Sequence, residues 1–291
     1  MSQNMLLVDE ADTSARSRRA LVLAGGGVSG IAWMLGVIDG LRRRNLDLAG
    51  ADLIVGTSAG ACVGAAIATG ALEPAVARQR RAETSEIVVP FDAGTYFATL
   101  TRLATDAPDP RTGLVRIANM GPLGPTVSEA ERRAVIAARL PVHGWPRKRL
   151  LVTAVDAQEG ELVTFDRESG VDLVDAVTAS CALPGVWPAA TVDGRRYVDG
   201  GIRSPTNADL ATGHDLVVIL VPIQLTDAFR ARLDRETDVL SPSDVHVIAA
   251  DDASLAAIGP NAMDPARRGV ALGAGLAQAE REIDALAEKW R

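Results

Sequence analysis

The amino-acid sequence predicts an α/β protein with one central, mostly parallel sheet and helices on both faces of that sheet. Two observations support this fold class. Short, wholly apolar runs alternate with helix-length segments in the first part of the chain, and similar apolar runs return in the second part. Strands that are apolar throughout and alternate with helices are typical of a parallel sheet covered on both sides.

The first four elements show the alternation most clearly. A strand is predicted at Ala20–Ala24 and ends at the turn Gly25–Gly27. A helix over Ser29–Arg44 follows, with apolar residues at helical spacing and arginines in its last turn. A second strand, Asp52–Val55, leads at once into a helix at about Ala59–Ala68. This strand–helix–strand–helix order predicts parallel strands.

A helical insertion is predicted around residues 73–146. Connectors that contain proline and glycine separate its expected helices, which lie near Pro74–Arg81, Ala93–Ala104 and Val127–Ala138. In a chain that is only 3% aromatic, the insertion also holds a local group of Phe91, Tyr96 and Phe97. Two interpretations stay open: a helical excursion with a small core of its own, or a cap whose apolar face lines a ligand site.

The second half of the chain returns to strands. One hairpin is predicted from Arg149–Val155 and Glu161–Asp166, and another turns at Asp193-Gly194. A helix is expected between them at Val171–Ser180. Two buried strands are predicted at Leu216–Val221 and Val245–Ala249, with a charged mobile loop between them at Asp227–Asp244. A closing helix is expected at Pro265–Trp290.

The domain organisation is predicted to be simple. No internal repeat or linker divides the sequence, so one domain over residues 18–291 is expected after a flexible tail over residues 1–17. The tail lacks an apolar run and is not a signal peptide. The uncharged segment Leu53–Leu72 has glycines at the spacing of packed membrane helices, but it divides into a strand, a turn and a helix, so a membrane span is rejected.

The composition of the chain restricts the kinds of molecule that we expect it to bind. The chain is 47% hydrophobic and 23% charged, which is ordinary for a soluble globular protein. Its net charge of −7 argues against nucleic acid as a partner. Cys62 and Cys181 are too few for a disulfide framework, so the cytoplasm is the expected location. Transient contact with a membrane surface stays open, and the sequence does not indicate an oligomeric state.

The first motif with chemical meaning is G-x-S-x-G, from Gly56 to Gly60, with Ser58 at its centre. It lies between a predicted strand and a predicted helix. A serine on such a sharp turn presents its hydroxyl above the sheet, and flanking glycines allow the backbone to turn that tightly. The sequence therefore predicts Ser58 as a nucleophile, with a tight structural turn as the alternative.

The second motif is glycine-rich and comprises Gly25, Gly26, Gly27 and Gly30. It matches the dinucleotide fingerprint G-x-G-x-x-G, but a nucleotide site also needs an acid at the end of the second strand. The nearest acid, Asp52, precedes that strand, and the G-x-S-x-G turn occupies its end. The favoured interpretation is an oxyanion loop made by the N–H groups of Gly25, Gly26 and Gly27. A nucleotide site and a packing turn are the alternatives.

The third motif is Asp199-Gly200-Gly201, which alone is also a common turn. A serine nucleophile needs a base, which in most triads is a histidine. His143 lies in a proline-rich connector and His214 in a turn. His246 follows in the chain order of α/β-hydrolases, but it lies inside a predicted strand, where a structural role is favoured.

Together these motifs resemble the patatin-like phospholipase family, from about Ala20 to Asp215. The resemblance extends to Ala179–Pro184 and to Val198–Gly201. It implies a three-layer α/β/α fold and a Ser–Asp dyad, with Ser58 as nucleophile, Asp199 as base and the glycine loop as oxyanion hole. Gly30, Gly56, Gly60, Gly200 and Gly201 support these motifs. It implies no metal or other cofactor.

The implied reaction is hydrolysis of a lipid ester or a small carboxylic ester through an acyl-enzyme on Ser58. Residues 73–146, as a cap, would line the acyl-chain site. A carboxylate base with an ordinary pKa of about 4 predicts activity that persists well below pH 6.

One position departs from the family pattern. Members commonly carry Arg or Lys just before the last glycine of the first motif, where this chain has Ser29. A cation there could meet a phosphate, so its absence makes a neutral ester as good a candidate as a phospholipid. Two other functional classes stay open: a non-catalytic lipid-binding or regulatory protein that keeps the fold, and a dinucleotide-dependent oxidoreductase that uses the glycine loop.

Overall fold

The computed structural model describes residues 17–290, so nearly all of the predicted tail over residues 1–17 lies outside the described residues. The described chain is built around one eight-stranded sheet with the order β5-β6-β3-β2-β1-β7-β8, and β4 pairs with β3. Its strands are β1 (Arg19–Leu23), β2 (Leu53–Thr57), β3 (Arg149–Asp156), β4 (Leu162–Phe165), β5 (Ala190–Val192), β6 (Arg195–Asp199), β7 (Leu216–Val221) and β8 (Asp244–Ala249).

The sheet is mixed. Five consecutive strands of this path run parallel to one another: β3, β2, β1, β7 and β8. The pairings of β3 with β4, β3 with β6 and β5 with β6 are antiparallel. The two predicted hairpins produce the β3–β4 and β5–β6 pairings, since short turns join these strands. The pairing of β3 with β6 joins the two hairpins. The predicted α/β class is confirmed, with an antiparallel margin on one side of the parallel strands.

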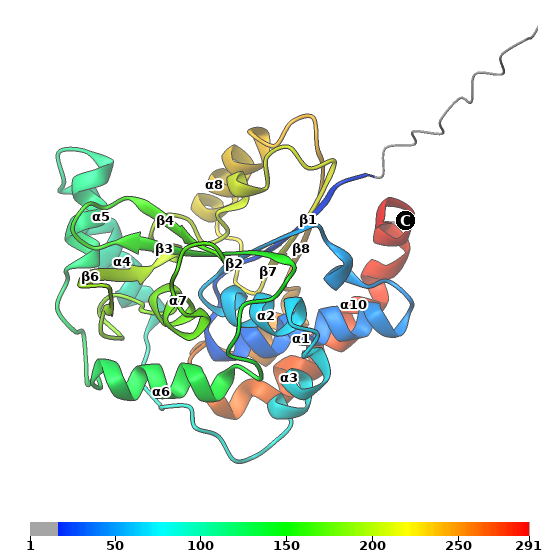
Figure 1. Ribbon diagram of the computed structural model, residues 1–291, viewed down its shortest axis with the longest axis horizontal. Coiled ribbons are helices and arrows are strands. Elements are labelled where there is room, and N and C mark those ends of the chain that lie inside the picture. Colours follow the sequence, from blue (N-terminus) through cyan, green and yellow to red (C-terminus); the bar gives the residue numbers. More distant parts are fainter. Residues whose placement is uncertain (1–16, 291) are drawn as a thin grey trace, which may run out of the picture.

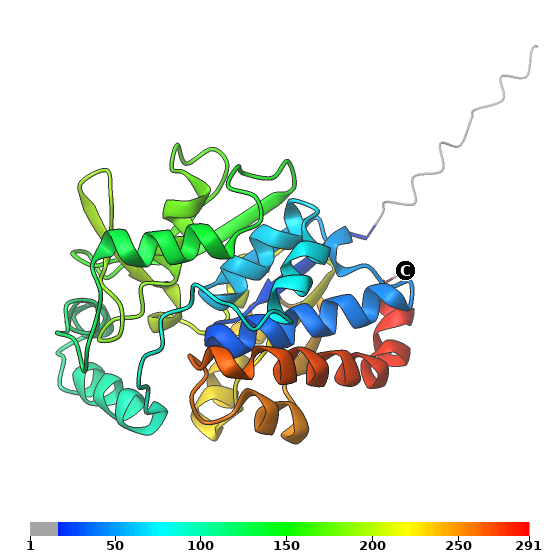
Figure 2. The same cartoon turned by 90° about the horizontal axis from the view of Figure 1, so that it is seen from below.

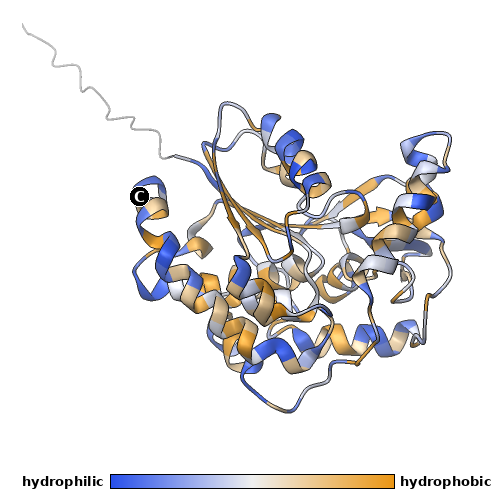
Figure 3. Cartoon of the chain, turned by 180° about the vertical axis from the view of Figure 1, so that it is seen from behind, coloured by the Kyte–Doolittle hydropathy of each residue, from blue (hydrophilic) through white to orange (hydrophobic). Residues whose placement is uncertain are grey.

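Helices cover both faces of the sheet (Figure 1). One face carries α1 (Gly27–Arg43), α2 (Ala59–Ala68), α7 (Leu173–Ser180), α9 (Asp252–Ile258) and α10 (Arg268–Trp290). The other carries α8 (Asp227–Asp238) and the 3₁₀ turn η3 (Ala208–Ala211). In β1, Leu21 and Leu23 pack on the first face, while Ala20 and Val22 pack on the second. In Figure 3 much of the centre of the sheet is coloured as hydrophobic, as two buried faces require.

Helices α1 and α10 lie side by side along the first face (Figure 2). Small residues allow this close approach: a Cβ on Gly36 would lie 2.3 Å from the Leu272 carbonyl oxygen, and one on Gly275 would lie 2.2 Å from the Trp33 carbonyl oxygen. The Trp33 side chain is fully buried between the helices, and its Nε1 donates to Gln278 at 3.3 Å.

The predicted helical insertion is confirmed, with four helices where three were predicted. They are α3 (Leu72–Gln79), α4 (Ala93–Thr105), α5 (Pro110–Ala118) and α6 (Glu129–Arg139). The sequence missed α5 because Pro110 suggested a connector. Proline is favoured at the first position of a helix, and here Asp109 caps that helix by accepting from the Thr112 N–H at 2.9 Å.

The prediction of a mobile loop at Asp227–Asp244 was wrong for most of that segment. Residues 227–238 form α8, which begins after the N-cap Thr226. Most of its charged residues are exposed, while Leu233 and Phe229 pack on the second face of the sheet. Glu236 is an exception and accepts from the Thr206 hydroxyl. Further short 3₁₀ turns lie elsewhere in the fold, namely η1 (Leu48–Gly50), η2 (Gly200–Ile202) and η4 (Pro265–Arg267). Within residues 17–290, no helix is long and apolar enough to cross a membrane.

Candidate active site

Ser58 occupies the sharp turn between β2 and α2, in the context that the sequence predicted. Its backbone has φ 54° and ψ −112°, a left-handed conformation that is strained for a residue with a side chain. The flanking glycines are sterically required. A Cβ on Gly56 would lie 2.6 Å from Ala61 Cα, and one on Gly60 would lie 1.9 Å from the Leu23 carbonyl oxygen. This geometry is that of a nucleophile elbow.

The end of α7 fixes the Ser58 backbone. The Ser58 N–H donates to Ser180 Oγ at 2.9 Å, and Cys181 Sγ lies 3.3 Å from the Ser58 carbonyl oxygen that it donates to. Cys62, one turn into α2, has its Sγ 3.8 Å from that of Cys181. The segment Ala179–Pro184, which was singled out only through the family resemblance, therefore supports the nucleophile turn directly.

Asp199 ends β6, and the structure brings it to Ser58. Strand β3 lies between β2 and β6, with Thr153 opposite Thr57 and Ala154 opposite Asp199. The residue Asp199 is 1% exposed, and its carboxylate accepts a hydrogen bond from the Gly201 N–H at 2.8 Å. The Ser58 side chain lies close enough to lower the pKa of this carboxylate. The side chain of Asp199 can thus take the proton of the Ser58 hydroxyl.

Burial changes the proton affinity of this carboxylate. Loss of solvent raises the pKa of Asp199 to about 7, although the Ser58 side chain, the hydrogen bond from Gly201 and the positive charge of Arg132 act in the opposite direction. This value contradicts the ordinary aspartate pKa on which the expectation of activity well below pH 6 rested. The sequence does not reveal how completely Asp199 is buried.

The glycine loop lies beside the nucleophile, but its three N–H groups are not equivalent. A Cβ on Gly25 would lie 3.7 Å from Ser58 Cβ, yet the Gly25 N–H donates to the Pro205 carbonyl oxygen at 2.9 Å and is not free for an oxyanion. For Gly25 the predicted role is thus contradicted. Within residues 17–290, no backbone acceptor engages the N–H of Gly26 or Gly27 at the start of α1.

Glycine is also required in this loop for packing. A Cβ on Gly26 would lie 2.3 Å from Pro222 Cγ, and one on Gly30 would lie 3.1 Å from the same atom. Gly27 has φ +66°, and a Cβ there would lie 2.6 Å from the Ala262 carbonyl oxygen. The loop therefore approaches its neighbours too closely for any residue other than glycine at these positions.

A buried polar network lies beneath the dyad, and the sequence did not reveal it. Thr57 Oγ1 and Thr153 Oγ1 are 2.9 Å apart, and Asn207 Nδ2 donates to Thr57 Oγ1 at 3.0 Å. Gly200 is needed at this point because a Cβ would lie 2.4 Å from Thr153 Oγ1. These contacts tie the β2 and β3 ends to the segment after Asp199.

Each of the three histidines has a different neighbour. His246 lies in β8 with its Nε2 3.6 Å from Glu282 Oε2 on α10. His143 Nε2 lies 2.8 Å from the Ala137 carbonyl oxygen, and His214 Nδ1 lies 2.9 Å from that of Ala211. None of them contacts Ser58, so the structural role predicted for His246 agrees with its position.

A small hollow of about 10 Å³ adjoins Ser58. Its lining comprises Gly27, Val28, Ser58, Ala59, Arg132, Arg139, Cys181, Leu183, Trp187 and Met263. The sequence analysis missed both arginines. A signal was present, because Arg132, Val135, Ile136 and Arg139 recur at helical spacing and form the buried face of α6.

An apolar cluster borders this hollow. Its buried members are Val89, Tyr96, Val186 and Trp187, and Phe91, Leu183 and Met263 pack against them. The insertion thus has the small core of the first interpretation, and that core also adjoins Ser58, as the cap interpretation requires. The buried Tyr96 hydroxyl has no hydrogen-bond partner, and burial, followed by the nearby charge of Asp199, raises its pKa.

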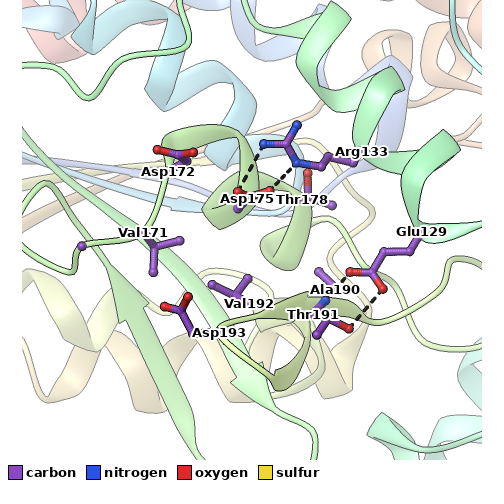
Figure 4. Close-up of a pocket in the computed structure, with 11 residues that line it drawn as sticks. Glu129, Arg133, Val171, Asp172, Asp175, Thr178, Ala190, Thr191, Val192 and Asp193 are labelled. Carbon is purple, nitrogen blue, oxygen red and sulfur yellow. Dashed lines mark hydrogen bonds and ion pairs between the residues drawn. The ribbon is translucent and has the colours of Figure 1, made fainter.

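A larger cavity of about 400 Å³ lies away from these residues, between α6, α7 and β5 (Figure 4). Acidic side chains dominate its wall, and the two that form contacts across it are Asp175, which pairs with Arg133, and Glu129, which accepts from Thr191. Neither Ser58 nor Asp199 lines it. The smaller hollow, which Ser58 lines, is therefore the candidate active site.

Comparisons with known proteins place this chain in a family. The family model described as patatin-like phospholipase matches residues 21–212. Uncharacterized NTE family proteins of Mycobacterium bovis and Mycobacterium tuberculosis are each 32% identical over 227 residues, covering 78% of this chain and 54% of theirs. This chain thus spans about half the length of those relatives. The crystal structure of VipD from Legionella pneumophila is similar with a TM-score of 0.44 and 15% identity, over 92% of this chain and 67% of that one.

Proposed function

Because the chain belongs to the patatin-like phospholipase family, we propose that it is a serine hydrolase that cleaves the acyl esters of lipids. The observation that carries the proposal is the pairing of Ser58, on a strained strand-to-helix turn, with the buried carboxylate of Asp199. A strained serine beside a positioned base is the arrangement that nucleophilic acyl transfer needs.

In the proposed reaction, Asp199 accepts the proton of the Ser58 hydroxyl as its oxygen attacks the ester carbonyl carbon. The carbonyl oxygen becomes an oxyanion, which the N–H groups of Gly26 and Gly27 stabilise together with the positive end of α1. Collapse expels the alcohol, which takes the proton from Asp199. Water, deprotonated by Asp199, then attacks the acyl-enzyme, and its collapse releases the fatty acid and restores Ser58.

The apolar cluster is the proposed acyl-chain site. Leu183, Trp187 and Met263 belong both to this cluster and to the lining of the hollow at Ser58. The hollow itself holds about 10 Å³, roughly the space of one water. An acyl chain must therefore displace side chains of the cluster, most of which come from the insertion or from the segment after α7. We propose that the insertion opens as a cap when a lipid binds.

The two rival functions fit these observations less well. A dinucleotide needs a phosphate-sized opening at the glycine loop, whereas Gly26 and Gly27 pack closely against Pro222 and Ala262. A non-catalytic lipid-binding protein has no need for a strained nucleophile turn, which costs on the order of 1–3 kcal/mol. Cytoplasmic location and transient contact with a membrane surface remain predictions from composition.

Labelling with a fluorophosphonate tests the proposal, because this reagent phosphonylates activated serine hydroxyls. We expect modification of Ser58 alone, identified by peptide mapping, and no modification of the Ser58→Ala variant. Ser29 and Ser180 serve as internal controls, since both are fully buried near the site. Absence of labelling in folded protein would contradict the proposal, as would labelling at either control serine.

A further inference from the structure

Arg132 is a buried cation without a carboxylate that hydrogen-bonds to it. It extends from α6 into the hollow that also contains Ser58, and the residue is only 4% exposed. Its guanidinium carbon lies 3.9 Å from the centre of the Trp187 ring, on which it stacks. The buried Nε has no hydrogen-bond partner. Among residues 17–290, no carboxylate forms a salt bridge with Arg132, and its side chain donates no hydrogen bond.

The other arginines of the same helix are partnered. Arg139, which lines the same hollow, forms a buried ion pair with Glu86, with Nε and Nη2 donating at 3.0 and 2.6 Å. Arg133, the next residue, leaves α6 in a different direction and pairs with Asp175 in the larger cavity (Figure 4). Glu86 is fully engaged by Arg139, so one positive charge beside Ser58 has no hydrogen-bonded carboxylate.

An unpaired buried charge is costly, so its presence calls for an explanation. Burial lowers the pKa of Arg132 to about 10, which still leaves the guanidinium charged at neutral pH. Its Coulomb effect reaches Asp199, whose pKa it lowers. The stacking on Trp187 holds the flat group in place, and a guanidinium can donate two parallel hydrogen bonds to a phosphate or a carboxylate.

We propose that Arg132 is the specificity-determining residue of this site and binds an anionic phosphate ester that the substrate carries near its scissile acyl bond. This proposal rests on the proposed function and names its substrate class, an acyl ester of a glycerophosphate. Ser29, at the position where a cation would otherwise stand, is neutral and donates its hydroxyl to the Ala262 carbonyl oxygen at 3.2 Å. Arg132 supplies the missing charge from a different element, the helix α6.

A pair of substrates that share the acyl glycerol and differ in the phosphocholine headgroup tests the proposal. The first is a monoacylglycerol, and the second is the lysophosphatidylcholine with the same acyl chain, both used as monomers. For wild type and variants, kcat/KM is measured on both. We expect Arg132→Met to lower the ratio of lysophospholipid to monoacylglycerol hydrolysis about tenfold or more, as loss of a charged hydrogen bond implies. Monoacylglycerol hydrolysis falls less, through the effect on Asp199.

Arg133→Met is the matched control. It removes the same charge from the next position of α6, but Arg133 lines the larger cavity and not the hollow at Ser58. Its half-exposed ion pair contributes little, so we expect both rates to stay within about twofold of wild type. Thermal unfolding distinguishes this proposal from a structural role, because loss of a residue that stabilises the fold would lower the Tm. Removal of an uncompensated buried charge should leave the Tm of Arg132→Met unchanged or higher. Arg132→Lys, which keeps the charge without the planar fork, should give an intermediate ratio.

Inhibition identifies the source of the anion. With monoacylglycerol as substrate, we expect glycerophosphocholine to compete in wild type and not in Arg132→Met. Equal competition by inorganic phosphate would assign a free-phosphate site instead, and competition by fatty acid alone would assign a carboxylate site. Equal loss on both substrates, or a lowered Tm for Arg132→Met, would overturn the proposal. Failure of wild type to hydrolyse either ester would instead overturn the proposed function.

Discussion

The Ser58 N–H donates to the hydroxyl oxygen of Ser180 at 2.9 Å, across 122 residues of sequence. The bond joins the nucleophile turn to the last residue of α7. In a nucleophile elbow the N–H of the serine itself points away from the oxyanion, so it needs an acceptor elsewhere. Ser180 is fully buried and supplies that acceptor. The strained φ of Ser58 is therefore held by a contact from outside the motif.

Ser180→Ala should lower both stability and turnover. The substitution leaves the buried Ser58 N–H without an acceptor, which costs about 1–3 kcal/mol of folding free energy. We also expect kcat to fall while KM changes little, because the turn and not the lipid contact is altered. Denaturant unfolding and steady-state kinetics measure the two effects. The exposed Ser169→Ala is the control, and an unchanged kcat in Ser180→Ala would show that the turn holds without this bond.

The acid limb of the pH profile should lie near neutrality. Burial raises the pKa of Asp199 to about 7, and the base acts only when ionised. We therefore expect kcat/KM to fall as the pH decreases through about 7, when it is measured on a neutral ester. Arg132→Met should move this limb upward, because the guanidinium lowers the pKa of Asp199. A limb near pH 4 in wild type would mean that Asp199 is solvated during turnover.

His246→Ala should retain most of the activity. A buried aspartate that titrates near 7 is almost indistinguishable by pH profile from a histidine, whose ordinary pKa is about 6.5. Only substitution separates the two bases. His246 faces Glu282 from an edge strand, so its removal should leave kcat within about twofold of wild type. An inactive but folded His246→Ala would instead favour a Ser–His mechanism.

Asp199→Asn should abolish turnover and stabilise the fold at alkaline pH. A pKa raised in the folded state means that the stability due to this group is fully present below about pH 4 and is lost as the pH rises through about 7. A neutral amide avoids that loss, which is on the order of 4 kcal/mol for the cited shift. We expect a higher Tm than wild type at about pH 8 and a smaller difference at about pH 5. A lower Tm at both would show that Asn cannot replace the contacts of Asp199.

Much of the fold could be predicted from local patterns. Strand β7 is wholly apolar and β1 is apolar after Arg19, and α2 follows β2 at the residue that the G-x-S-x-G turn indicated. The errors arose where a local signal had two meanings. Pro110 begins α5, although proline often ends helices, and the charged residues of α8 hid the apolar side that Leu233 presents to the sheet.

The candidate site was predictable in its residues but not in its electrostatics. Ser58 and Asp199 could be chosen because their motifs are local. The burial of Asp199, the engaged N–H of Gly25 and the unpaired charge of Arg132 depend on segments far apart in the sequence. Arg132 in particular lies on the buried face of α6. The helical spacing places it on that face but does not reveal whether its charge has a partner.

The position of β1 in the sheet affects how the protein folds. This first strand lies between β2 and β7, and the N–H of Arg18 just before it is bonded to Asp215, 197 residues away. Contacts of such sequence separation slow folding, because a long loop must close before they form. During synthesis, β1 and β2 emerge long before β7, so the centre of the sheet cannot be completed until β7 has been made. We therefore expect slow refolding after dilution from denaturant, with the apolar edge of β1 exposed to aggregation in the meantime.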